Sequence, residues 1–355
     1  MNSATPRSPS LTRAAVAWCA LAFVAPQIHA QETSVQQPPA QAANESAAEP
    51  PIEADAPIEE VVVSGEQPGP GLWKVSKGDH VLYILGTLQP LPQKMTWRSR
   101  SVEAVIAESQ EVLTNTDVDA DIGFFKGLML APSIIGIRKS PEGKTLQQAL
   151  PADLYARWLT LKARYIGRDS GVEKWRPIFA AQELYSKAIE KSGLTYSSIV
   201  WPVVKKVANK HDIKITRPQI VVAIDKPRAA IKEFKKSSLD DIDCFAKTLQ
   251  RLETDLESMR ARANAWAVGD VETLGKLAPP DQNAACRDAI MNSQVVQERG
   301  FQDVPTRMSS AWADAAERAL ANNKSTFAVL SMAEMFRSDG YIAMLQSRGY
   351  VVEAP

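Results

Sequence analysis

Histidine is scarce in this chain: His29, His80 and His211 are the only three among 355 residues. Imidazole is a usual ligand of catalytic zinc and the usual base in Ser-His-Asp and Cys-His sites. We expect His80, in a Gly-Asp-His turn, and His211, at a helix end, to be exposed to solvent. The sequence also lacks a Gly-x-Ser-x-Gly segment and a glycine-rich phosphate-binding loop. These absences argue against the common hydrolase and nucleotide-binding sites.

The chain also lacks an apolar run long enough to span a membrane, which takes about 20 residues. The nearest candidate, Ala14–Ala25, follows Arg7 and Arg13 and is followed by a small residue at Ala30. This order is typical of a secretory signal peptide, so we expect residues 1–30 to be removed after Ala30. The mature protein is then expected to be periplasmic or secreted, with no transmembrane segment.

Basic residues are absent from the next stretch, which holds eight acids between Gln31 and Glu66. Because residues 31–70 are rich in Pro, Ala and Gln, they predict a flexible acidic leader. From Gln67 onward, 39 basic residues stand against 33 acidic ones, and they are scattered. This pattern is typical of a solvated surface, and we expect no nucleic-acid partner.

Within the leader, acidic residues precede a run of valines in Ile58–Glu66. Such a segment could add as an edge strand to a partner protein. The interpretation we favour is a linker whose valines pack on their own domain.

Cysteine is equally scarce, with three residues in the chain, and only Cys244 and Cys286 follow the predicted signal peptide. An even pair in an oxidising compartment favours one disulfide. Both lie in helical patterns separated by the Pro279-Pro280 break, so an antiparallel pairing is reasonable. Two separately buried thiols are the alternative.

Residues 71–355 predict one α/β domain with a central, mostly parallel sheet and many helices. Short apolar runs predict strands at Val81–Leu85, Glu111–Thr114, Ile213–Thr216, Phe327–Leu330 and Tyr350–Val352. Spacing of three and four residues predicts helices at Trp97–Ser109, Leu150–Tyr165, Trp175–Lys191, Val200–Lys210, Leu239–Val268 and Gln302–Ala321.

Two strand-then-turn segments carry the polar residues of greatest interest. The first runs from Val81 through Leu85 to Gly86, which would turn the chain sharply and place Gln89 at the strand's carboxyl end. The second, TFAVLSMAE, ends on Glu334. If the strands are parallel neighbours, Leu85 and Val329 are buried in the centre of the sheet, and both polar residues face one crevice.

These two segments resemble the signatures of the TraB/GumN family, relatives of the TIKI metalloproteases. In that family an LW-x-V/I segment and a strand lead to Gly-x-x-His, and a later strand ends in a second Gly-x-x-His. The chain has Leu72-Trp73-Lys74-Val75 before its first strand. After the second strand it keeps the family's later positions, at Asp339, Gly340, Leu345, Gly349 and Tyr350.

The chain departs from the family at the positions that carry chemistry. Gln89 replaces the first motif histidine, and Ser331 and Glu334 stand at the glycine and histidine positions of the second motif. Asn115 falls where the family tends to carry Glu, whereas Asp117 is retained. The resemblance therefore implies the family scaffold with a degenerate site.

From this resemblance we expect a non-catalytic binding or scaffold role in the cell envelope, with an envelope protein or peptide as partner and no cofactor. A hydrogen bond between Gln89 and Glu334 would close the vacated site. The alternative is a metal-dependent, peptidase-like hydrolase. It would use Glu334 and Asp117 as candidate catalytic carboxylates, with Gln89 helping to hold one divalent cation such as Mn or Zn.

Overall fold

The computed structural model of the chain describes residues 66–67, 69–120, 130, 132–277, 284–335, 337 and 340–355. The predicted signal peptide, residues 31–65 of the leader with their valine run, the Pro279-Pro280 break and Asp339 lie outside the described residues. Within the described part, no helix combines the length and the hydropathy that crossing a membrane requires.

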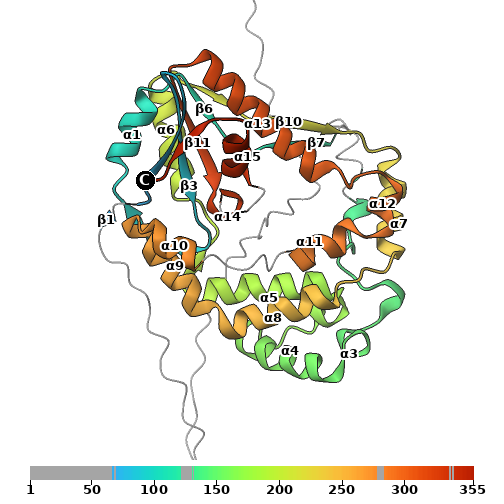
Figure 1. The fold of residues 1–355 in the computed structure, drawn as a ribbon. Coiled ribbons are helices and arrows are strands. Elements are labelled where there is room, and N and C mark those ends of the chain that lie inside the picture. Colours follow the sequence, from blue (N-terminus) through green and yellow to red (C-terminus); the bar gives the residue numbers. More distant parts are fainter. Residues whose placement is uncertain are drawn as a thin grey trace, which may run out of the picture.

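A six-stranded sheet forms the centre of the fold (Figure 1). Its strands, in spatial order, are β12 (Val351–Glu353), β2 (Leu72–Lys77), β3 (His80–Thr87), β11 (Ser325–Ser331), β6 (Glu111–Leu113) and β9 (Lys214–Thr216). The four strands from β3 to β9 are parallel neighbours, whereas β2 is antiparallel to both β3 and β12. The predicted α/β class with a mostly parallel sheet is confirmed.

Strands β3 and β11 lie side by side in the middle of the sheet, with Leu85 opposite Val329. Leu85 is fully buried, as predicted. The prediction for Val329 is wrong, since it is only half-buried and packs at the margin of its cluster.

Alternating residues of these strands pack on helices at opposite faces of the sheet. Leu85 and Phe327 face the cluster that includes α1 (Arg100–Ala107) and α6 (Val200–Lys210). Their neighbours Ile84 and Ala328 face α13 (Val304–Asn322) and α15 (Tyr341–Ser347). Figure 1 shows these two pairs of helices on either side of the sheet.

A helical layer lies beside this sheet layer in Figure 1. Its helices are α3 (Leu146–Ala149), α4 (Ala152–Tyr165), α5 (Pro177–Lys191) and α8 (Ile242–Thr254). They share a core in which the rings of Trp158 and Phe245 lie 5.5 Å apart. The disulfide between Cys244 of α8 and Cys286 of α11 (Ala284–Met291) is confirmed, with the sulfurs 2.04 Å apart.

The single long helix predicted over Leu239–Val268 is wrong: α8 ends at Thr254, and α9 spans Leu256–Val268. Asp255 separates them, and its carboxylate accepts hydrogen bonds of 2.8 and 3.2 Å from Arg262. Asp competes for backbone groups inside helices and favours their ends, which explains the break.

A two-stranded parallel ribbon was not predicted from the sequence. It consists of β7 (Asp117–Ala120), which follows β6 in the chain, and β10 (Gln219–Val222), which follows β9. The remaining elements are β1 (Glu66–Gln67), β4 (Leu91–Pro92), β5 (Thr96–Trp97), β8 (Leu194–Thr195), α7 (Pro227–Lys236), α10 (Val271–Lys276), α12 (Gln294–Glu298), α14 (Met332–Met335) and two short 3₁₀ turns, Pro141–Gly143 and Gly171–Lys174.

Candidate functional site

The structure brings both sequence motifs to the same end of the sheet. Because β3 and β11 are parallel and Thr87 pairs with Ser331, the segments that follow the two strands leave the sheet side by side. Gln89 follows β3 by two residues, and Glu334 lies in α14, which begins directly after β11. We call this end of β3, β11, β6 and β9 the carboxyl edge. It is the place where open α/β sheets hold their ligands.

Gly86 has a different role from the sharp turn that its position suggested, because β3 continues through it to Thr87. A Cβ atom on Gly86 would lie 2.7 Å from Cγ of Met332, closer than two carbons can approach. The Gly86 carbonyl also accepts a 3.1 Å hydrogen bond from the buried indole of Trp266. Glycine is required here so that α14 can pack closely on the strand.

Gln89 is exposed, and its Nε2 donates a 2.6 Å hydrogen bond to the backbone carbonyl of Tyr196. Tyr196 lies in the loop between β8 and α6, so the amide ties the end of β3 to that loop. The expected hydrogen bond between Gln89 and Glu334 is absent, although both residues belong to the described part of the chain.

Glu334 forms an ion pair with Arg337 instead, with its Oε2 3.9 Å from Nε. Both side chains are well exposed, at 46% and 35%, and such pairs contribute about 0–1 kcal/mol. Burial, and then the nearby Glu334 charge, raise the pKa of Tyr341, whose ring lies 4.4 Å from that of Trp312. Glu334 thus sits at the rim of an aromatic cluster, accessible to a ligand.

The other two predicted positions lie further along the edge. Asn115 is exposed in the link between β6 and β7. Asp117 opens the β7–β10 ribbon, is half exposed, and lies 4.0 Å from the guanidinium of Arg217. Asp117 and Glu334 therefore each have an arginine of their own, and no group of three or more His, Cys, Asp or Glu among the described residues could hold a metal ion.

His80 and His211, the histidines within the described residues, lie away from this edge. His80 begins β3 at the opposite end of the sheet, where its Nδ1 lies 2.6 Å from the Leu320 carbonyl. The prediction of an exposed His80 is wrong: its side chain is 24% accessible because it packs beside the end of α13. His211 is exposed after α6, as predicted.

Sequence reasoning missed the aromatic residues that support the edge, above all Trp266, Trp312 and Tyr341. Trp266 and Trp312 are fully buried, and the Trp312 indole nitrogen has no hydrogen-bond partner. Their helical spacing gave no signal beyond that of a core residue.

A family model described as the TraB/PrgY/gumN family matches residues 71–354. This match covers most of the chain, which therefore belongs to that family. Comparison with curated proteins and with solved structures found no match.

Proposed function

We propose that this member of the TraB/PrgY/gumN family is an exported, non-catalytic protein that binds an envelope protein or peptide at the carboxyl edge. The family's GumN members are associated by name with exopolysaccharide production, which favours an envelope role. The amino-terminal signal-like sequence and the Cys244–Cys286 disulfide both suit an oxidising compartment.

The chemistry of the edge supports binding over catalysis. Gln89 presents an exposed amide already engaged with the Tyr196 carbonyl, where the family resemblance leads us to expect a histidine. An amide donates and accepts hydrogen bonds but does not titrate near neutral pH, so it cannot act as a general acid or base. Asn115, Ser331 and Glu334 add further polar groups suited to recognising a polar peptide.

The residues present do not fit the metal that the family resemblance implies. Gln89 is bonded to Tyr196, Glu334 pairs with Arg337, and Asp117 lies on the ribbon beside Arg217. We expect the purified protein to contain far less than one Mn, Zn or Co ion per chain by elemental analysis. About one ion per chain, lost in Glu334→Ala but kept in Asp119→Ala, would instead support the metal-dependent hydrolase.

Site-specific photo-crosslinking in the cell envelope tests the binding role. A benzophenone amino acid in place of the exposed Gln89 should crosslink to a discrete envelope protein, whereas the same group in place of the exposed Lys232 on α7 should not. Equal products at both positions would contradict the proposal. Export itself predicts a mature chain that begins at Gln31, which intact-mass measurement of the periplasmic fraction checks.

A further inference from the structure

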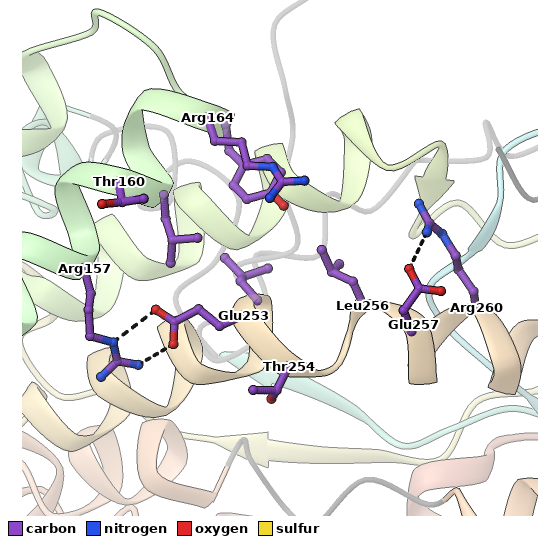
Figure 2. A pocket seen from close by; sticks show the side chains of 11 residues that line it. Arg157, Thr160, Arg164, Glu253, Thr254, Leu256, Glu257 and Arg260 are labelled. Atoms are coloured by element: carbon purple, nitrogen blue, oxygen red, sulfur yellow. Dashed lines mark hydrogen bonds and ion pairs between the residues drawn. The ribbon is translucent and has the colours of Figure 1, made fainter. Parts of the chain in front are cut away.

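A groove of about 470 Å³ between α4, α8 and α9 is a charged surface whose ion pairs are internal (Figure 2). Arg157 makes hydrogen bonds of 3.0 and 2.7 Å to Glu253, and Arg260 donates to Glu257 at 2.7 Å. Figure 2 shows these two ion pairs at opposite ends of the groove. Because both arginines are paired with neighbouring glutamates, they offer no unpaired charge to a ligand.

Segment 132–139 and helix α7 form a surface of a different kind. Together they hold six basic residues and one acid, Glu233, which pairs with Arg299 at 2.6 Å. Lys232 and Lys236, one turn apart on α7, are exposed, and their ammonium groups form no ion pair or hydrogen bond within the described part of the chain. Like charges four residues apart disfavour a helix, so an anionic partner would stabilise this face.

Two isoleucines lie beside these lysines. Ile135 is 76% exposed, the highest value among the large apolar side chains of the described residues, and Ile134 is 39% exposed. Lys235 connects them to α7, since its Nζ donates a 2.6 Å hydrogen bond to the Ile135 carbonyl. A single exposed apolar residue is ordinary. Two adjacent ones beside a row of lysines suit the surface of an anionic bilayer, which accepts apolar side chains below its headgroups and cations at them.

The chain next to the isoleucines is held in place. The Arg138 carbonyl accepts a 2.9 Å hydrogen bond from the Arg176 amide, and the Arg138 guanidinium lies 5.1 Å from the centre of the Trp175 ring. Gly136 has a φ of 78° and turns the chain directly after Ile135. Because the segment is already formed, little conformational freedom is lost when its tip binds a surface.

We propose that this surface binds the protein to an anionic phospholipid bilayer. We call it the α7 patch and define it by Ile134, Ile135, Lys232, Lys235 and Lys236. The isoleucines enter the boundary beneath the headgroups, and the lysines contact the phosphates. An apolar anchor combined with a basic patch gives reversible attachment that neither provides alone. The patch contains none of the carboxyl-edge residues, so the inference does not depend on the proposed function.

A fluorescent reporter within the full chain tests this attachment. A dansyl amino acid in place of Ile134 reports insertion at the patch itself, and so separates it from any binding by the apolar residues 14–25. Its emission should shift to shorter wavelength with vesicles that contain phosphatidylglycerol and stay unchanged with vesicles of phosphatidylcholine alone. Added salt should reverse the shift, because it screens the lysines.

Two pairs of lysines then test the charge. Lys232→Gln with Lys236→Gln should weaken vesicle binding about 25-fold, since each lysine near an anionic surface contributes roughly fivefold. The matched control is Lys205→Gln with Lys206→Gln, which removes the same charge from two exposed lysines of α6. Figure 1 shows α6 on the opposite side of the molecule from α7, so the control should leave the affinity nearly unchanged.

A charge in place of an isoleucine tests the apolar contribution. Ile135→Asp should weaken binding by about tenfold or more, because the side chain no longer gains from leaving water. Leu159→Asp, at the exposed leucine of α4, should not weaken it. All variants should keep the melting temperature of the wild type, since the substituted side chains are exposed.

Several results would overturn the proposal. They are equal shifts with neutral and anionic vesicles, no shift with either, and equal losses in the two lysine pairs. A shift that requires added envelope protein instead of lipid would show that a protein covers the patch, and would also overturn it.

Discussion

Glu111 on β6 and Asp241 at the start of α8 are both shielded from water, yet their pKa values move in opposite directions. Burial raises the pKa of Glu111, but hydrogen bonds from Thr216, Lys214 and Asn323 outweigh it, so the net pKa is lowered. Burial also raises the pKa of Asp241. Its 2.9 Å hydrogen bond from the Ile178 amide offsets this only in part, and the net pKa stays raised.

The contrast shows that the sheet layer and the helical layer are stabilised differently. The sheet surrounds its partly buried carboxylate with three donors, two from β9 and the third, Asn323, from the end of α13. At the junction of α5 and α8, the charge of Arg176 acts on Asp241. Arg176 is only 2% exposed, and one of its nitrogens, Nη1, has no hydrogen-bond partner. Burial lowers the pKa of Arg176. The Cys244 disulfide lies three residues from Asp241, so we expect the helical layer to depend on the covalent bond and on pH more than the sheet does.

The largest expected effect tests the sheet core. Leu85→Ala should lower the free energy of unfolding by about 2–5 kcal/mol, because a fully buried leucine leaves a cavity when it is truncated. Leu159→Ala, at a leucine that is 45% exposed on α4, should change it by less than about 0.5 kcal/mol. Urea titration measures both. Equal losses would show that the sheet centre is not tightly packed.

Removing the disulfide should have the next largest effect. Cys244→Ser with Cys286→Ser should cost about 2–4 kcal/mol, because the bond closes a long loop in the unfolded chain. Thermal melting of the oxidised protein and of the double variant measures the loss.

Hydrogen exchange then shows which layer responds. Amides of α5, α8 and α11 should exchange faster in the double variant, whereas those of β3 and β11 should change least. Faster exchange throughout the sheet would break the distinction between the two layers. Two titratable thiols in protein from an oxidising compartment would contradict the disulfide itself.

A smaller effect separates the structural and the exposed parts of the first motif. Gly86→Ala should destabilise the protein by about 1–3 kcal/mol, because the added carbon meets the stem of buried Met332. Gln89→Ala should cost less than about 1 kcal/mol, since it removes one exposed hydrogen bond. Comparable losses in denaturant titrations would mean that Gln89 is part of the scaffold and not free to serve a ligand.

The sequence predicted the sheet centre and several helices because the burial patterns there are simple. The apolar run through Leu82, Ile84 and Leu85 indicates a strand buried on both faces. The helix over Val200–Lys210 was predicted with its observed ends. The β7–β10 ribbon was missed because segments such as Asp117–Ala120 alternate polar and apolar residues over only four positions.

The carboxyl edge was predictable in its residues but not in its contacts. Two parallel strands that end in similar motifs suffice to place Gln89 and Glu334 at one end of the sheet. The sequence says nothing of Tyr196, which lies 107 residues from Gln89 and accepts its hydrogen bond. Nor does it show that Met332 requires a glycine at residue 86, since this contact depends on how α14 packs.

The smallest expected effect concerns the carboxylates of Glu111 and Asp241. It is the sign of the change in folding stability with pH that each of them causes. Glu111 has a lowered pKa in the folded state, so its stabilising contribution is present above the ordinary glutamate pKa of 4.5 and is lost as pH falls from there through the folded value. Asp241 has a raised pKa, so the folded state favours its proton, and stability is lost as pH rises from 3.8 through the folded value. Urea titrations of Glu111→Gln and Asp241→Asn across the acid range measure both contributions.

Relative to the wild type, Glu111→Gln should become progressively less stable as pH rises toward 4.5 and then change little. Asp241→Asn should gain relative stability as pH rises above 3.8, because the asparagine carries no charge to bury and can still accept the Ile178 hydrogen bond. Opposite signs would establish that hydrogen bonding controls the sheet carboxylate and that desolvation controls the helical one. If both differences had the same sign, the two layers would not differ in how they accommodate a buried charge.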